Sequence, residues 1–355
     1  MTAEPGFKQP AAAPSAAVPS AAVPSAAVPS AAVPSAVIEL VGRARRILLL
    51  THHNPDGDAL GSAFALARIL GRDGRQVDLA LTGFWSEHLS FLLDGLSLVE
   101  KPGVFSGYDL VVLLDCHTFG RLGEDGSTAD DLPALVVIDH HPLTEGEKAG
   151  ENWFIQPAAS STGELVWLFL KACRLQAPPE AAEALLLAIA SDTGFFSQSN
   201  VTAGTLEAAA GLVEWGGCLE RVHRRLKADL PLRRLKLMGS ALDSLRLHCG
   251  GRLAIMAVTP DLLEKAGAVM ADTEDLVEMG RSLAGVTLSA LIKDEGRGVG
   301  RVRVSLRSRE PVNASALAGF FGGGGHRLAA AYNDPEAATA EEAAANLLAR
   351  AERCL

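Results

Sequence analysis

The stretch Thr51–Ser62, which reads THHNPDGDALGS, brings one imidazole and two carboxylates close together in the chain. His52 is followed by Asp56 and Asp58. Two carboxylates about 4 Å apart repel each other by on the order of 4 kcal/mol at an effective dielectric of about 20, and a divalent cation removes that cost. An imidazole with carboxylates suits manganese or magnesium better than a thiolate metal. A turn whose aspartates cap a helix is the alternative left open.

The segments on either side of this stretch predict a strand, a loop and a helix. Residues 47–50 form a continuous apolar run, and apolar residues recur at helical spacing over residues 63–70. The loop between them therefore lies at the carboxyl end of a strand, where open α/β sheets bind ligands. Gly57 lets the backbone turn tightly between the two carboxylates.

Three further apolar runs predict strands, at residues 76–81, 109–114 and 135–138. They are short and separated by helical or loop material. This order predicts a mostly parallel sheet with helices on both of its faces.

Two of these strands end in residues that could extend the same site. Asp115 ends one of them, and the other is followed by Asp139, His140 and His141. A single aspartate after a strand is usually a turn or cap residue, but the carboxyl ends of parallel strands converge, so the repeated endings favour one shared site. Asp192, at the end of a predicted helix over residues 178–190, is either a helix-end residue or the last carboxylate of that site.

Composition limits the classes of function. The chain has 355 residues, of which 48% are hydrophobic, and a formal net charge of -10. This charge argues against binding long nucleic acid, which requires basic surface, but it leaves room for a small phosphorylated ligand held by local arginines. The absence of an 18-residue apolar run and of a signal peptide predicts a cytoplasmic protein with no membrane partner. The scattered cysteines agree with a reducing cytosol: Cys116, Cys173, Cys218, Cys249 and Cys354.

The sequence divides into a tail and two larger parts. Residues 1–36 contain AAVPS repeats, whose prolines forbid a helix, and we expect a disordered Ala/Pro/Ser-rich tail. Leu230–Leu247 is amphipathic, with Leu235, Met238, Leu242 and Leu245 predicted on one side, and is expected to link the two parts. Strands are then predicted at residues 253–258, 286–293 and 299–309.

Two features of the C-terminal part could hold phosphate. Alternation over residues 299–309 places Ser305 and Arg307 on one face with three more arginines, although a solvated polar face is the common alternative. The sequence FFGGGGHRLAAA, residues 320–331, predicts glycines before a small-residue helix, with His326 at the helix start. Backbone N–H groups at such a helix start could bind an anion.

The motifs HxxPDGDALGS, LLDCH, IDHHP, ASDTG, SLRS and GGGGHRLAA, in this order, resemble those of the DHH phosphoesterases that carry a DHH-associated C-terminal domain. The similarity is greatest to the bacterial nanoRNase and pAp phosphatase subgroup. It spans about residues 37–355 and leaves out the tail. One departure is Ala331, where the family motif usually has glycine.

The resemblance implies two divalent metal ions, manganese for preference. His52, Asp56 and Asp115 would bind the first, and the second would be held by Asp58, Asp115, His140 and Asp192. Asp139 would orient His140, and His141 would face the scissile phosphate. The residues expected to bind substrate are Arg307, His326, Gly323, Gly324, Gly325, Arg121 and Ser305. His53 and His117 are additional imidazoles without an assigned role.

The function implied by the resemblance is hydrolysis of oligoribonucleotides of two to five nucleotides to mononucleotides, and of 3′-phosphoadenosine 5′-phosphate (pAp) to AMP. Two metals would activate a bridging water. The alternatives are a pApA or cyclic-di-AMP phosphodiesterase and a non-catalytic nucleotide-sensing module. The substrate would be a small nucleotide or short RNA, with no long duplex; a homodimer is compatible with the sequence, which does not fix the oligomeric state.

The implied architecture is α/β in both folded parts. Residues 37–229 would form the catalytic domain, residues 230–249 a linker helix, and residues 250–355 a smaller α/β substrate-binding domain. The active site would lie in the cleft between these domains.

Overall fold

The computed structural model describes residues 32–99, 105–122, 133–143, 146–294, 296, 298–352 and 355. The side chains of Asp73 and His326 are outside this description, as is nearly all of the tail expected at residues 1–36. The chain forms two compact units, which meet between Leu226 and Lys227 in the sequence. Among the described helices, none is long and apolar enough to cross a membrane.

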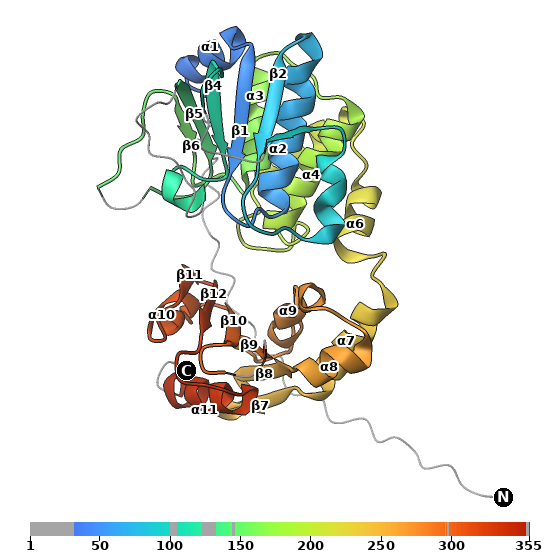
Figure 1. The fold of residues 1–355 in the computed structure, drawn as a ribbon, viewed down its shortest axis with the longest axis vertical. Coiled ribbons are helices and arrows are strands. Elements are labelled where there is room, and N and C mark those ends of the chain that lie inside the picture. The colour runs from blue at the N-terminus through green and yellow to red at the C-terminus, as the bar shows by residue number, and fades with distance from the viewer. Residues whose placement is uncertain are drawn as a thin grey trace, which may run out of the picture. The chain divides into compact units, whose positions relative to one another are not determined.

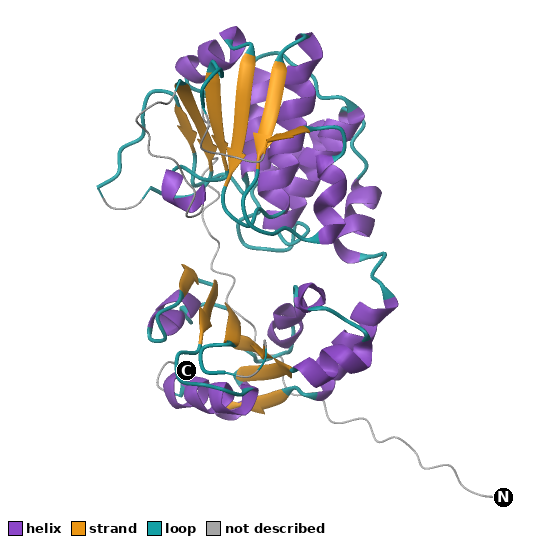
Figure 2. Cartoon of the chain, in the orientation of Figure 1, coloured by secondary structure: helices purple, strands orange, loops and turns teal. Residues whose placement is uncertain are grey.

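The first unit is built on a six-stranded parallel sheet (Figures 1 and 2). Its order is β3-β2-β1-β4-β5-β6, with every neighbouring pair parallel. This confirms the predicted fold class. The strands are β1 (Arg46–Thr51), β2 (Gln76–Ala80), β3 (Ser97–Val99), β4 (Leu110–Leu114), β5 (Ala134–Asp139) and β6 (Trp153–Ile155).

Both faces of this sheet are buried, which explains why its strands read as continuous apolar runs. In β1, Ile47 and Leu49 join the core formed with the α-helices, and Leu48 and Leu50 join a second core on the other face. That second core includes Leu122 of the short 3-10 helix η3 (Phe119–Leu122). The α-helices of the unit are α1 (Ser35–Arg43), α2 (Gly57–Leu70), α3 (Thr162–Ala172), α4 (Pro179–Asp192), α5 (Ala203–Glu214) and α6 (Leu219–Lys227). The 3-10 helices η1 (Gly71–Asp73) and η2 (Glu87–Leu93) complete it.

The second unit contains a mixed six-stranded sheet of order β11-β12-β10-β9-β8-β7. Only β8 and β9 pair in parallel within it; the other neighbours are antiparallel. Its strands are β7 (Arg246–His248), β8 (Leu253–Val258), β9 (Leu288–Asp294), β10 (Val302–Ser308), β11 (Gly324–His326) and β12 (Ala329–Asn333). Its helices are α7 (Leu232–Asp243), η5 (Cys249–Gly251), α8 (Pro260–Ala266), η6 (Met270–Thr273), α9 (Leu276–Arg281), α10 (Ala314–Gly319) and α11 (Ala340–Ala351).

Strand β10 has the alternation that the sequence predicts. Val302, Val304 and Leu306 are buried in a core with residues of α10 and α11, whereas Ser305 and Arg307 on the opposite side are partly exposed. Ser305 and Arg307 therefore lie on the face of β10 that is opposite to this core.

The glycine-rich segment is a β-hairpin, and the predicted helix after the glycines is wrong. β11 pairs with β12, so that Gly324 lies opposite Ala331 and Gly325 opposite Ala330. Gly323 has Ala331 and Tyr332 too close to leave room for a Cβ. Pairing with β10 outweighs the helix propensity of the alanines and makes β12 a strand.

The α7 segment buries only part of the predicted side, because Met238 and Leu245 pack against the core of the second unit whereas Leu235 and Leu242 do not. Leu237 and Ala241 are its buried residues, and Leu235 and Leu242 are exposed. The segment 230–249 ends in strand β7 of the second sheet, so its C-terminal part is not helical.

Candidate metal centre

The expected metal-binding side chains come together at the carboxyl edge of the first sheet. His52 follows β1, Asp115 follows β4, and His140 follows β5. Helix α2 contributes Asp56 and Asp58 at its start, and α4 contributes Asp192 at its last position. The structure thus brings all six predicted residues into one cluster.

Asp115 lies between two imidazoles. Its Oδ2 is 3.3 Å from Nε2 of His52, and its Oδ1 is 3.4 Å from Nε2 of His140. The backbone at Asp115 has φ +60°, a left-handed conformation that aspartate tolerates better than most residues. Each carboxylate oxygen therefore serves a different half of the cluster.

The first half contains His52 and Asp56. Nδ1 of His52 is 2.9 Å from the carbonyl oxygen of His53, which can only accept, so Nδ1 carries the proton. In the neutral ring Nε2 then has the free lone pair, and it points at the carboxylates of Asp115 and, at 3.9 Å, Asp56. This is the orientation that a metal ligand requires.

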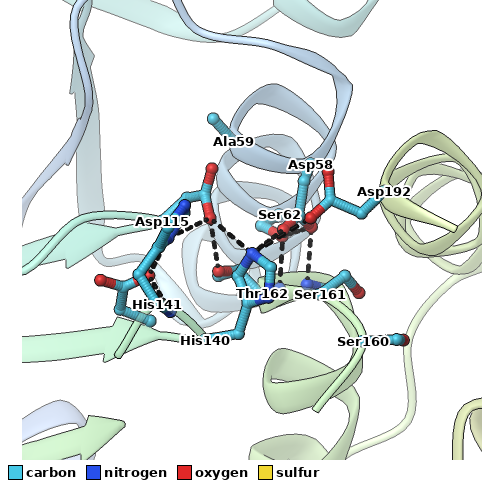
Figure 3. Close-up of polar contacts among 12 residues, drawn as sticks. Asp58, Ala59, Ser62, Asp115, His140, His141, Ser160, Ser161, Thr162 and Asp192 are labelled. Atoms are coloured by element: carbon cyan, nitrogen blue, oxygen red, sulfur yellow. Dashed lines mark hydrogen bonds and ion pairs between the residues drawn. The ribbon is translucent and has the colours of Figure 1, made fainter. Parts of the chain in front are cut away.

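The second half contains His140 and two further carboxylates. Nε2 of His140 is 3.1 Å from Oδ2 of Asp192 and 3.8 Å from Oδ2 of Asp58 (Figure 3). Asp58 is fully buried, and its carboxylate accepts the backbone N–H groups of Thr162 and Gly163 at 2.7 and 2.8 Å. Asp58 is therefore fixed by the first turn of α3, whose positive dipole end stabilises a carboxylate.

The cluster concentrates negative charge in a poorly solvated place. Burial, together with the charge of Asp192, raises the pKa of Asp58 well above its usual value, and burial raises the pKa of Asp192 to about 6. Burial lowers the pKa of His52, but its contacts with Asp115 and Asp56 outweigh burial and raise that pKa to about 10. Positive charge in the cluster would therefore stabilise these carboxylates.

The comparisons with known proteins show the family of this chain. The DHH family, N-terminal domain, matches residues 46–189, and the DHHA1 domain matches residues 250–355. A bifunctional oligoribonuclease and PAP phosphatase, NrnA, of Thermus thermophilus is 32% identical over 293 residues, which cover 80% of this chain and 82% of that relative. The chain belongs to the DHH family.

Two other relatives place this DHH protein among enzymes and folds of the same kind. A probable manganese-dependent inorganic pyrophosphatase of Enterococcus faecalis is 27% identical over 173 residues, 48% of this chain and 55% of that relative. The crystal structure of an exopolyphosphatase-related protein from Bacteroides fragilis has a TM-score of 0.78 at 24% identity and covers 90% of this chain and 97% of its own, which confirms the fold. The DHH family match, the oligoribonuclease and PAP phosphatase relative and the donor groups of the metal centre together show that the DHH protein is a metal-dependent phosphoesterase.

The donor set of the DHH protein fits divalent ions that prefer oxygen and imidazole ligands. Among the residues that the structure describes, the clusters able to hold an ion are His52 with Asp56 and Asp115, Asp58 with His140 and Asp192, and Asp115 with His140 and His141. Cys116, directly after Asp115, is buried, and burial raises the pKa of its thiol far above the usual value. Its thiol belongs to none of these clusters.

The Asp-His-His run of the DHH protein differs in one contact from the expectation. Asp139 accepts from Nδ1 of His141 at 2.7 Å and from Nδ1 of His117 at 2.5 Å, and it does not orient His140, which points to the other carboxylates. Both bonds, and above all that of His141, hold the pKa of Asp139 below its usual range despite burial. His117 also lies 3.3 Å from Glu147 through Nε2.

Sequence reasoning assigned no role to several residues of this site. Thr162 donates to both Asp58 and Asp115, and its signal was the Ser-Ser-Thr-Gly run at the start of α3. For His117 the sequence indicates only an additional imidazole near the site. Glu147 lies in a loop without a local pattern, so no sequence signal marked it.

Two of the substrate residues expected in the second unit, Ser305 and Arg307, lie on the same face of β10. Arg307 donates through Nε to Glu278 at 3.0 Å, and Ser305 is its neighbour on the same face of β10. Gly324 and Gly325 are in β11, directly after Gly323. The His326 side chain lies outside the described residues. In the first unit, Arg121 is exposed on η3, and its carbonyl accepts the N–H of His53 at 2.6 Å.

Proposed function

We propose that this DHH protein hydrolyses pAp to AMP and short oligoribonucleotides to mononucleotides, using two divalent ions, preferably manganese. The observation that carries the proposal is the position of Asp115, whose two oxygens face His52 and His140 separately. The identity to the oligoribonuclease and PAP phosphatase of Thermus thermophilus supports the choice of substrates. We place the reaction in the cytosol, because the sequence has scattered cysteines and no CxxC pair.

The residues would hold the ions in two groups that share Asp115. His52 and Asp56 would complete the first group, and Asp58, His140 and Asp192 the second. Bound divalent ions would supply Lewis acidity and lower the pKa of a bound water. The bonds from Thr162 and Gly163 keep the Asp58 carboxylate fixed before any ion binds.

His141 is proposed to contact the phosphoryl group. Its Nδ1 donates to Asp139, which sets the ring so that Nε2 is the nitrogen directed away from that carboxylate. A protonated imidazole in this position donates to a phosphoryl oxygen as negative charge develops there. Asp139, held in turn by His117, positions the ring and balances its charge.

The remaining substrate contacts are proposed for two places. Arg121 near the metal centre would bind a phosphate, and Arg307, Ser305, His326 and residues 323–325 of the second unit would bind the part of the substrate that does not react. Support comes from the partial exposure of the polar face of β10. Because Glu278 already pairs with Arg307, a phosphate must share or displace that carboxylate.

The test is a substrate panel assayed with chelated protein and with manganese restored. We expect hydrolysis of pAp and of a diribonucleotide only with the metal, and slower hydrolysis of cyclic-di-AMP. Preference for cyclic-di-AMP would favour the rival phosphodiesterase. Failure of the metal-loaded protein to hydrolyse any of them, while still binding nucleotide, would favour a sensing module and overturn the proposal.

A further inference from the structure

The loop after β2 is hydrogen-bonded to the loop that carries the metal-binding residue His52, and it has two exposed aromatic side chains. Phe84 is 86% exposed and Trp85 is 36% exposed, in a segment that packs neither ring into a core. A phenylalanine ring that stays this exposed does not gain the favourable free energy of removing its apolar surface from water. One exposed aromatic is ordinary on a protein surface, so its position decides whether it has a role.

This loop is fastened to the loop that carries His52. The N–H of Phe84 donates to Oδ1 of Asn54 at 2.8 Å, and the N–H of Asn54 donates to the carbonyl of Thr82 at 3.0 Å. Gly83, at φ +80°, lies so close to Asn54 and His53 that a Cβ would clash with both. The backbone that presents Phe84 is therefore held against a residue two positions after a metal ligand.

The same two loops are joined to the helix that carries Arg121. The hydroxyl of Thr82 donates to the carbonyl of Leu122, and the N–H of His53 donates to the carbonyl of Arg121. The exposed guanidinium of Arg121 and the exposed ring of Phe84 thus belong to three short segments tied together by hydrogen bonds at the rim of the metal centre. A cation and an aromatic ring on joined segments match the phosphate and the base of one nucleotide.

We propose that Phe84, assisted by Trp85, is the surface on which a nucleobase of the substrate stacks. This proposal rests on the proposed function. It assigns a binding site to the base of the substrate, which the metal-binding residues would not contact. An aromatic face accepts any base because every base has a π-face, so the site would select for a nucleotide over a bare phosphoester with little preference among bases. The hydrogen bonds to Asn54 and Thr82 hold the platform in place before substrate arrives.

The test compares pAp with ribose 3,5-bisphosphate, which has the same phosphates and no base. Phe84→Ala should lower kcat/KM for pAp roughly five- to a hundredfold, mainly by raising KM. The same variant should leave kcat/KM for the base-free compound unchanged. Phe84→Tyr should retain the wild-type preference. The matched control is Leu206→Ala, which removes an exposed apolar side chain from α5 and should change neither value.

Two results would overturn the platform: an unchanged kcat/KM for pAp in Phe84→Ala, or an equal loss on both compounds, which would show a structural role for the loop. Sedimentation of the wild type and of Phe84→Ala tests whether a second copy of the chain covers this surface instead. A wild-type dimer that becomes monomeric in Phe84→Ala would show an interface between copies and would also overturn the stacking proposal.

Binding separates this proposal from the proposed function. If the wild type hydrolyses neither compound, the proposed function has failed, but calorimetry with AMP and ribose 5-phosphate still tests the platform. AMP should bind more tightly, and Phe84→Ala should remove the difference. Equal affinities in the wild type would overturn the stacking role even if pAp is hydrolysed.

Discussion

The hydroxyl of Thr162 donates to Oδ1 of Asp115 at 3.0 Å. The backbone N–H of the same residue donates to Asp58 at 2.7 Å. One residue at the start of α3 therefore fixes two carboxylates, one in helix α2 and the other directly after strand β4. This arrangement fixes their separation before any cation binds, which is the condition for a preformed metal site.

Replacing Thr162 by valine removes the hydroxyl and keeps the backbone bond to Asp58. We expect manganese to bind about ten- to a hundredfold more weakly, the usual effect of losing a hydrogen bond to a ligating carboxylate. The measurement is a manganese titration by calorimetry. Thr205→Val is the control, since it removes an equally buried hydroxyl that bonds to Glu164 away from the cluster. Equal manganese affinity in wild type and Thr162→Val would show that Asp115 needs no such support.

His117 is predicted to position His141 through the carboxylate that they share. His117→Ala removes the second donor to Asp139, and we expect kcat for pAp to fall about tenfold with metal content unchanged. His117→Asn places an amide donor near the position of Nδ1 and should recover part of the rate. If His117→Asn and His117→Ala lose the same rate, or if His117→Ala loses metal, the positioning role is wrong.

Arg307 is predicted to contribute to substrate binding and not to the chemical step. Arg307→Ala should lower kcat/KM on pAp and on a diribonucleotide about ten- to a hundredfold, as expected for a charge-assisted hydrogen bond. Arg307→Lys should recover little, because lysine lacks the planar fork. Arg301→Ala, an exposed arginine before β10, is the control. Wild-type kinetics in both Arg307 variants would make this face only a solvated surface.

The N-terminal repeats are predicted to be dispensable. Deleting residues 1–31 should leave the rate and Tm nearly unchanged, because Ala, Pro and Ser have little apolar surface to bury. Extending the deletion through residue 41 removes Val37 and Val41, both buried in the core, and should lower Tm clearly. A loss of rate or Tm in the shorter deletion would assign the tail to the enzyme.

Much of the metal centre could be predicted because its residues are marked locally. Asp115 and Asp139 come at the ends of apolar runs, and parallel strands bring such ends together. What the sequence could not supply was which partner each side chain takes. The choice of Asp139 between His140 and His141 depends on ring rotation about one bond, and the link to His117 joins two different strand ends.

The glycine-rich segment shows a different limit. Its alanines favour a helix when considered alone, and the sequence gives no sign that an unpaired edge of β10 lies beside them. Pairing of Ser305 with Ala331 and of Arg307 with Ala329 makes them a strand. Likewise, Leu235 and Leu242 have helical spacing, but spacing alone does not tell which of two apolar stripes packs on the sheet.

The central proposal is that Asp115 would be shared by two ions, and electron paramagnetic resonance of the manganese-loaded protein tests it most directly. Two manganese ions that share a carboxylate are magnetically coupled, so the spectrum differs from that of isolated ions. We predict two ions per chain with a coupled spectrum, loss of the coupling and of pAp hydrolysis in Asp115→Asn, and neither loss in Asp109→Asn, an exposed aspartate before the same strand. A wild-type protein that hydrolyses pAp with one ion per chain, or with two uncoupled ions, would contradict the account.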